Sequence, residues 1–167
     1  IQRGLSATES VFSVLDENIQ ADLGEKEAKG VKGKIEFKQV SFLYDRGDYA
    51  INNISFTVES GQTVALVGKS GSGKSTIVNL IPRFYECSAG QVLVDDIDIR
   101  DFRLDSLRNQ ISLVTQQVML FEGTIAENIA YCSDKTNMVK VTEAAERAFA
   151  MDFIDKLPMG LKTQIGD

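Results

Sequence analysis

The stretch VALVGKSGSGKST, residues 64–76, constrains the fold more than any other part of the chain. Its first four residues are apolar, as in a strand that is covered on both faces of a parallel sheet. A loop of glycine, serine and lysine follows, and a helix is predicted to begin around Lys74. A buried strand, a flexible loop and a helix in this order predict an α/β fold with a ligand site at the loop.

The loop satisfies the pattern G-x-x-x-x-G-K-[ST] from Gly68 to Ser75. Its glycines allow consecutive backbone N–H groups to converge on one anion, because a side chain there would block close approach. Lys74 is predicted to reach the β- and γ-phosphates of a nucleotide, and the Ser75 hydroxyl to coordinate Mg²⁺. The predicted nucleotide-contacting residues of the loop are Gly68, Ser70, Gly71, Ser72, Gly73, Lys74, Ser75 and Thr76. A chance match is the alternative, and the position of the loop between strand and helix argues against it.

Composition excludes several other kinds of site. The chain has 167 residues, a net charge of −6 and no histidine, so a nucleic-acid-binding surface and a histidine base are not expected. Cys87 and Cys132 fit no metal-binding spacing and suit a reducing compartment. Because no apolar run approaches the roughly 18 residues of a membrane helix, the chain is predicted to be soluble. Because the net charge is negative, a phosphate site must depend on local positive charge.

The chain is predicted to begin with a helix and a linker. Apolar residues from Leu5 to Ile19 share one helix face, which fits either a separate amphipathic helix or the end of a longer helix from a partner domain. Residues 24–33 combine glycines and charges and are predicted to be a linker, with a domain boundary near residue 30.

Strands are predicted before helices. Apolar and polar residues alternate twice within residues 34–58, which predicts two half-buried, antiparallel strands, and residues 91–94 and 111–114 are further short strands. The last third is predicted to be helical, with a capping box from Thr124 to Glu127. One helix face there carries Val141, Ala145, Ala148 and Phe149.

Two residues outside the loop are candidate ligand contacts. Tyr44 ends a predicted strand about 24 residues before the loop, and its ring is able to stack on a base, although an ordinary strand aromatic is the alternative. Gln116 follows the predicted strand 111–114, at the carboxyl end where ligands gather in α/β sheets. A surface amide is the alternative for Gln116.

Together these features resemble the ATP-binding domain of ABC transporters, specifically exporters, over residues 31–167. The matching pieces are the aromatic loop at Tyr44, the phosphate loop, the segment IPRFYE and the glutamine loop at Gln116 with NIAY after it. Two stretches, LRNQISLVTQQVMLFEGTIAENIAY and AFAMDFIDKLPMGLKTQIGD, are most similar to bacterial exporters of lipids.

The resemblance implies a fold and a set of roles. The fold is an ABC-type ATPase core with an antiparallel β subdomain at 31–116 and a partial helical subdomain at 117–167, preceded at 1–30 by the end of a transmembrane-domain helix and a linker. Tyr44 would stack on adenine, and Lys74 and Gln116 would act in catalysis, with Gln116 at the magnesium ion or the attacking water. Residues 117–131 would face the transmembrane domain. The parent protein would be a homodimer at the cytoplasmic face of the bacterial inner membrane, with its lipid substrate bound elsewhere.

The chain departs from the family pattern at several points. Asp96 occupies a turn where the family usually has glycine, and Cys87 stands where proline is common. The sequence is expected to be a fragment, because it contains neither the signature motif nor an acidic strand with the general-base glutamate; VLVD, ending at Asp95, is only a partial match. We therefore expect nucleotide binding without efficient hydrolysis, and a strand 64–67 that lacks a neighbour.

Two other functions remain open at this point. A soluble phosphotransferase with a similar loop would need arginines in a lid, and the arginines after Lys74 are scattered. A soluble ABC-type ATPase of DNA repair or translation would carry coiled-coil or basic insertions, and the sequence has none. The N-terminal helix and linker favour the exporter.

Overall fold

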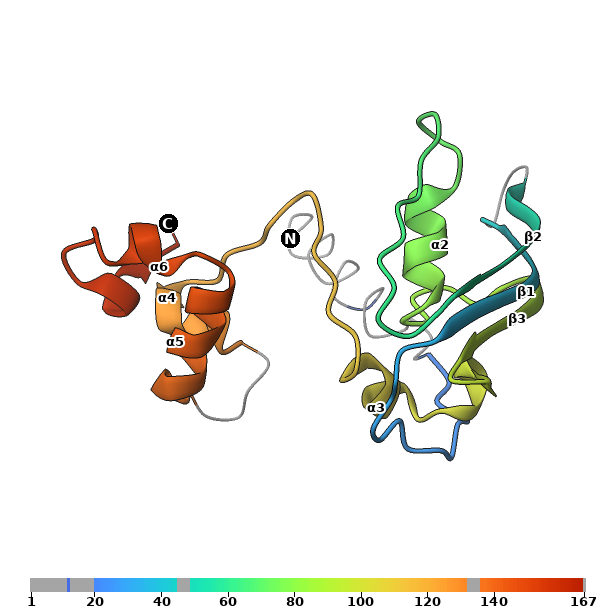
Figure 1. Ribbon diagram of the computed structural model, residues 1–167, viewed down its shortest axis with the longest axis horizontal. Coiled ribbons are helices and arrows are strands. Elements are labelled where there is room, and N and C mark those ends of the chain that lie inside the picture. Colours follow the sequence, from blue (N-terminus) through green and yellow to red (C-terminus); the bar gives the residue numbers. More distant parts are fainter. Residues whose placement is uncertain (1–11, 13–19, 45–48, 132–135, 167) are drawn as a thin grey trace, which may run out of the picture. The chain divides into compact units, whose positions relative to one another are not determined.

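The computed structural model describes residues 12, 20–44, 49–131 and 136–166. The chain divides into two compact units, Ile1–Ser112 and Leu113–Asp167, and each is described by itself (Figure 1). Most of the predicted helix from Leu5 to Ile19, and Cys132, lie outside the described residues.

The first unit is built on a four-stranded antiparallel sheet. The strand order is β2-β1-β3-β4, so the two strands predicted within residues 34–58 are confirmed as an antiparallel pair. The strands are β1 (Ile35–Leu43), β2 (Tyr49–Val58), β3 (Ala89–Val94) and β4 (Ile97–Asp98), and the helices are α2 (Lys74–Leu80), η1 (Ile99–Asp101) and α3 (Leu104–Arg108). The predicted strand 91–94 thus lies within β3, and α2 begins where the sequence predicts it.

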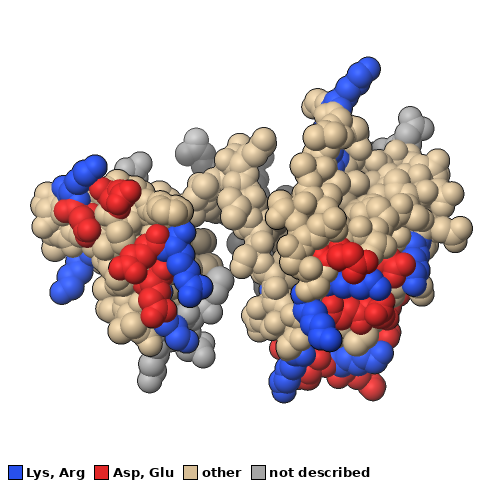
Figure 2. Space-filling view, in the orientation of Figure 1, with Lys and Arg blue, Asp and Glu red and all other residues tan. Residues whose placement is uncertain are grey.

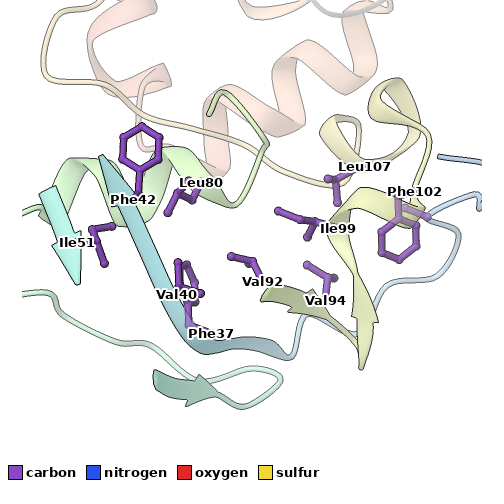
Figure 3. Packing of buried hydrophobic residues seen from close by; sticks show 11 residues of the cluster. Phe37, Val40, Phe42, Ile51, Leu80, Val92, Val94, Ile99, Phe102 and Leu107 are labelled. Atoms are coloured by element: carbon purple, nitrogen blue, oxygen red, sulfur yellow. The ribbon is translucent and has the colours of Figure 1, made fainter. Parts of the chain in front are cut away.

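The core of this unit lies between the sheet and α2. Phe37 and Val40 of β1, Val92 of β3 and Leu80 of α2 are each at most 1% exposed, and Figure 3 shows their side chains gathered between the strands and the helix. The Phe37 ring also stacks on Phe56 of β2, with centroids 4.6 Å apart. This packing fixes α2, and therefore the loop before it, against the sheet.

The prediction of a buried parallel sheet is wrong for the described residues. Segments 64–67 and 111–114 are not strands, and Val67 and Val114 are 89% and 92% exposed. The physical reason is pairing: an apolar strand is buried only when other strands cover its edges and faces. No backbone–backbone hydrogen bond joins residues 64–67 to another segment in the described ranges.

The turn between β3 and β4, where the family usually has glycine, has a left-handed backbone at Asp95 and Asp96. Asp95 and Asp96 have φ angles of 49° and 68°, the left-handed region that favours glycine. The Asp95 carboxylate accepts hydrogen bonds from the backbone N–H groups of Lys32 and Lys34 at 2.6 and 2.9 Å. Asp96 pairs with the Lys34 ammonium at 2.6 Å, which lowers the pKa of Asp96 and raises that of Lys34.

The predicted linker lies against η1 and α3. Lys26 forms a parallel bridge with Phe102, and the backbone N–H of Ala28, which is buried, donates to the Ser106 hydroxyl at 2.7 Å. The Lys26 side chain also pairs with Asp101 at 2.9 Å. This part of the chain is therefore anchored to the first unit.

The second unit is mainly helical. Its elements are β5 (Gly123–Thr124), α4 (Ile125–Ile129), α5 (Met138–Arg147), α6 (Met151–Ile154), η2 (Gly160–Lys162) and β6 (Gln164–Ile165). The capping box predicted from Thr124 to Glu127 is present at the start of α4. Val141 and Ala145 are buried on α5 as predicted. Phe149 is not, because α5 ends at Arg147 and Phe149 has a φ of 55° and is exposed, as is Ala148.

None of the helices in the described residues is long and apolar enough to span a membrane.

Candidate functional site

The loop before α2 has the backbone that the glycine pattern predicts. Gly71 and Gly73 have φ angles of 78° and 83°, where a side chain would be strained. Gly73 also has no room for one, since a Cβ there would lie 2.4 Å from the carbonyl oxygen of Ala50 in β2. Glycine at position 73 therefore lets the loop turn into α2 while it packs directly on β2.

The Lys74 side chain folds back over this loop. Its Nζ donates to the carbonyl oxygens of Gly68 and Lys69 at 2.9 and 2.7 Å, with the Ser72 hydroxyl 3.3 Å away. These acceptors are neutral, and an ammonium group bonds more strongly to an anionic oxygen. The loop thus holds the Lys74 ammonium group above its own backbone. This arrangement suits the binding of a phosphate group.

The start of α2 leaves its backbone donors available. Gly73 provides no side-chain cap, and the first turn carries no acidic residue. The side chain of Ser75 lies in this turn and is exposed, so its hydroxyl oxygen is accessible to a hard cation such as Mg²⁺. Lys74, the open backbone donors and Ser75 are together the donor set that a magnesium-bound phosphate needs.

Charge is distributed unevenly over the first unit. Figure 2 shows basic atoms at the tip of the loop before α2, whereas acidic and basic atoms lie side by side lower on this face of the unit. Lys69 and Lys74 are the basic residues of the loop. Although the chain has a net charge of −6, Lys69 and Lys74 place positive charge at the predicted phosphate loop.

Tyr44 lies next to the helix that follows the loop. Its hydroxyl is 3.1 Å from the hydroxyl of Thr76, which is buried in the first turn of α2. The residue is 43% exposed, and its ring makes edge contacts with Phe42 and Tyr85. The structure therefore brings Tyr44 and the predicted phosphate loop together, although 32 residues separate Tyr44 from Thr76.

Gln116 belongs to the second unit and is exposed. Its role at a magnesium ion or an attacking water stays a prediction. In contrast, the sequence predicts no role for Tyr85, yet its ring contacts the Tyr44 ring in the structure. The only signal for it was the aromatic pair in IPRFYE, directly after the predicted helix.

A second polar cluster lies at the other end of α2. Burial opposes the charge on Asp98, yet the Arg100 guanidinium, which donates to it at 2.6 and 3.0 Å, holds the Asp98 pKa below its usual range. Burial raises the pKa of the Cys87 thiol. A raised pKa favours the protonated thiol, which disfavours Cys87 as a nucleophile.

The fold and the loop define a class of protein. The family described as ABC transporter matches residues 51–164, more than half of the chain. The chain belongs to the ABC transporter family, as the sequence predicts.

Particular relatives narrow this class. An ATP-dependent lipid A-core flippase of Coxiella burnetii (strain RSA 493 / Nine Mile phase I) is 50% identical over 100% of this chain and 29% of its own length. A protein of the same description from Haemophilus influenzae (strain 86-028NP) is 49% identical over 99% of this chain and 29% of its own. The predicted similarity to bacterial exporters of lipids is thereby confirmed.

A solved structure agrees with these relatives. The bacterial Atm1-family ABC exporter with ATP bound superposes with a TM-score of 0.84 at 39% identity, covering 100% of this chain and 30% of that one. The chain thus spans about 29% of the length of the curated relatives that it matches.

Proposed function

We propose that the chain is the ATP-binding part of an ABC exporter that couples ATP binding and hydrolysis to movement of a lipid across the bacterial inner membrane. The observation that carries this proposal is the glycine loop with Lys74 folded over it, in a family that transports with ATP. The whole length of the chain is 50% identical to part of a lipid A-core flippase, which supports a lipid substrate.

Each residue of the site then has a role. The backbone donors of residues 68–76 hold the phosphates, and Lys74 moves from the carbonyls of Gly68 and Lys69 to the β- and γ-phosphate oxygens. Ser75 and Gln116 would hold Mg²⁺, which when bound neutralises charge on the phosphates. Tyr44 stacks on adenine. Lys74 and Gln116 act in hydrolysis, whereas the general base and the signature motif are supplied by other parts of a homodimeric parent protein.

Nucleotide titration of the chain with one matched pair of variants tests the site. In isothermal titration calorimetry with MgATP, Lys74→Ala is expected to abolish most of the affinity, because it removes the cation over the loop. Lys69→Ala is the control, since Lys69 contributes its carbonyl oxygen to the loop geometry and its side chain is outside the cradle contacts. Equal affinities in Lys74→Ala and Lys69→Ala would contradict the proposed function.

We further propose that the second unit carries the surface that contacts the transmembrane domain, near residues 117–131. A groove of about 460 Å³ there has mostly apolar walls, which include Val118, Leu120 and Ile129. Phe153 of α6 also lines it. Met119 at its rim is 79% exposed. An exposed apolar groove of this kind fits a helical segment that is itself amphipathic.

The groove is tested in the full-length exporter. Met119→Asp is expected to preserve ATP affinity but to remove the stimulation of ATPase activity by lipid, because a charge there prevents apolar docking. Val139→Asp on α5 is the control, since Val139 is also exposed and apolar but lies outside the groove. Lipid stimulation that survives Met119→Asp would rule out this docking surface.

Family membership argues against the two soluble alternatives. A small-molecule phosphotransferase does not account for the ABC transporter match over residues 51–164. A soluble ABC-type ATPase is less consistent with relatives that are described as lipid flippases.

A further inference from the structure

Three aromatic rings pack together beside the loop. The rings of Tyr44 and Phe42 are perpendicular with centroids 4.8 Å apart, and those of Tyr44 and Tyr85 are perpendicular at 5.3 Å. Phe42 and Tyr85 close the triangle at 5.4 Å. Perpendicular contacts of this length are favourable because the positive edge of one ring meets the negative face of another.

Two of the three rings are partly exposed. Phe42 is buried in β1, whereas Tyr44 and Tyr85 are 43% and 40% exposed. In the described part of the chain no ring stacks parallel on Tyr44. A nucleobase is a flat ring that stacks in this manner.

Tyr44 and Tyr85 are tied to the two ends of α2. Near its first turn, the Thr76 hydroxyl bonds to the Tyr44 hydroxyl at 3.1 Å. After its last turn, the chain turns back through Arg83, which has a φ of 54°, and so brings Tyr85 to Tyr44. Because α2 begins at the phosphate loop, the contact with Thr76 sets the position of Tyr44 relative to the loop, and Tyr85 contacts Tyr44 from the segment after the helix.

The turn that carries Tyr85 is itself held firmly. The Arg108 guanidinium of α3 donates to the carbonyl oxygens of Pro82 and Arg83, both at 2.9 Å. The Arg83 side chain is buried and pairs with Glu86 at 2.8 Å. These contacts hold the backbone just before Tyr85, and the Tyr85 ring itself packs against Phe42 and Tyr44.

We propose that Tyr85 is a positioning residue for nucleobase recognition: its ring holds the Tyr44 ring at the distance from the phosphate loop that a purine nucleoside triphosphate requires. The inference rests on the proposed function and deepens it. Tyr85 acts through Tyr44, so it affects only ligands that have a base. A ligand made of phosphates alone does not depend on it.

The test compares MgATP with magnesium tripolyphosphate by isothermal titration calorimetry on the whole chain. Tyr85→Leu removes the ring and is expected to weaken MgATP binding by about threefold to tenfold, the range that loss of an aromatic pair gives, with tripolyphosphate binding unchanged. Tyr85→Phe retains the ring and is expected to bind both ligands as the wild type does. If the circular dichroism of Tyr85→Leu departs from the wild type, Tyr85→Met, which fills more of the space, replaces it.

Two controls isolate the mechanism. Tyr131→Leu removes a ring that stacks on Phe121 at 4.1 Å in the other unit, and is expected to change neither affinity. In a Tyr44→Ala background, Tyr85→Leu is expected to have no further effect, because the residue that it positions is absent.

The results distinguish a failure of the role proposed for Tyr85 from a failure of the proposed function. Equal weakening of ATP and tripolyphosphate, or no weakening of either, overturns the role of Tyr85 while leaving the phosphate site intact. A wild-type chain that binds neither ligand overturns the proposed function, and the inference with it.

Discussion

Two apolar stretches of the first unit have similar sequences and different environments. QVLV, residues 91–94, lies in β3 between β1 and β4, and Val92 is 1% exposed. VALV, residues 64–67, has no partner strand among the described residues, and Val67 is 89% exposed. Hydrophobicity alone therefore does not decide burial; a strand also needs neighbours for its backbone and its faces.

The comparison also locates the site. The paired strands fix α2 through Leu80, Val92 and Phe37, which lie together in the core (Figure 3). The unpaired stretch leads directly into the phosphate loop at Gly68. The packed core therefore holds the end of the loop that leads into α2. The other end of the loop follows residues 64–67, which have no partner strand among the described residues.

The largest expected difference is between a buried residue of the paired sheet and an exposed one of the unpaired stretch. Phe37→Ala is expected to lower the free energy of unfolding by about 3–5 kcal/mol, because it leaves a cavity and removes the stack on Phe56. Val67→Ala is expected to change it by less than about 0.5 kcal/mol. Urea unfolding followed by circular dichroism measures both. A loss in Val67→Ala comparable to that in Phe37→Ala would show that residues 64–67 are buried in solution.

The same contrast explains what the sequence was able to predict. Alternation in β1 and β2 and the capping box at Thr124 are local patterns, and both are confirmed. The phosphate loop is local as well, since its residues are contiguous. Burial of residues 64–67 depends on strands distant in the sequence, and that prediction was wrong.

The site shows the same limit. Tyr44 is a candidate from the sequence because it ends a predicted strand before the loop and has a ring that is able to stack on a base, yet its contact with Thr76, 32 positions further along the chain, is visible only in the fold. The contact between Tyr85 and Tyr44 depends on the turn after α2. Such contacts depend on how distant segments of the chain pack together, and local sequence patterns do not reveal this packing.

The start of α4 has a complete capping box, and removing it tests a pattern that is local in the sequence. The Thr124 side chain accepts from the Glu127 backbone N–H at 3.1 Å, and the Glu127 carboxylate accepts from the Thr124 backbone N–H at 2.7 Å. Thr124→Ala is expected to destabilise the second unit by about 1 kcal/mol, because it removes the cap of α4. Thermal unfolding measures the effect, with Thr142→Ala on α5, away from any helix start, as the control.

The protonation of Glu127 reports on the same cap. The hydrogen bonds from Thr124, backbone first and hydroxyl second, lower the Glu127 pKa in the folded chain. Its contribution to stability is therefore present above the pKa of the unfolded chain and is lost as the pH falls through the folded value. In Thr124→Ala, NMR titration is expected to give a higher Glu127 pKa. An unchanged pKa would mean that the Thr124 hydroxyl does not contribute to it.

The smallest expected effect lies at the turn where the paired strand β3 ends. Asp96→Gly removes strain at a φ of 68° and also removes the ion pair with Lys34. The pair is exposed and contributes little, so the variant is expected to raise the Tm slightly, by about 1–2 °C. Because the pair lowers the Asp96 pKa, the stability it gives is present above the unfolded pKa and is lost as the pH falls. The advantage of glycine is therefore expected to increase from pH 7 to pH 3, and calorimetry at both pH values measures it. Asp96→Asn removes the charge but keeps a side chain at the same φ, so it is expected to lose the ion pair without the full relief of strain that glycine gives. A rise in Tm for Asn equal to that for Gly would contradict backbone strain as the cause of the gain.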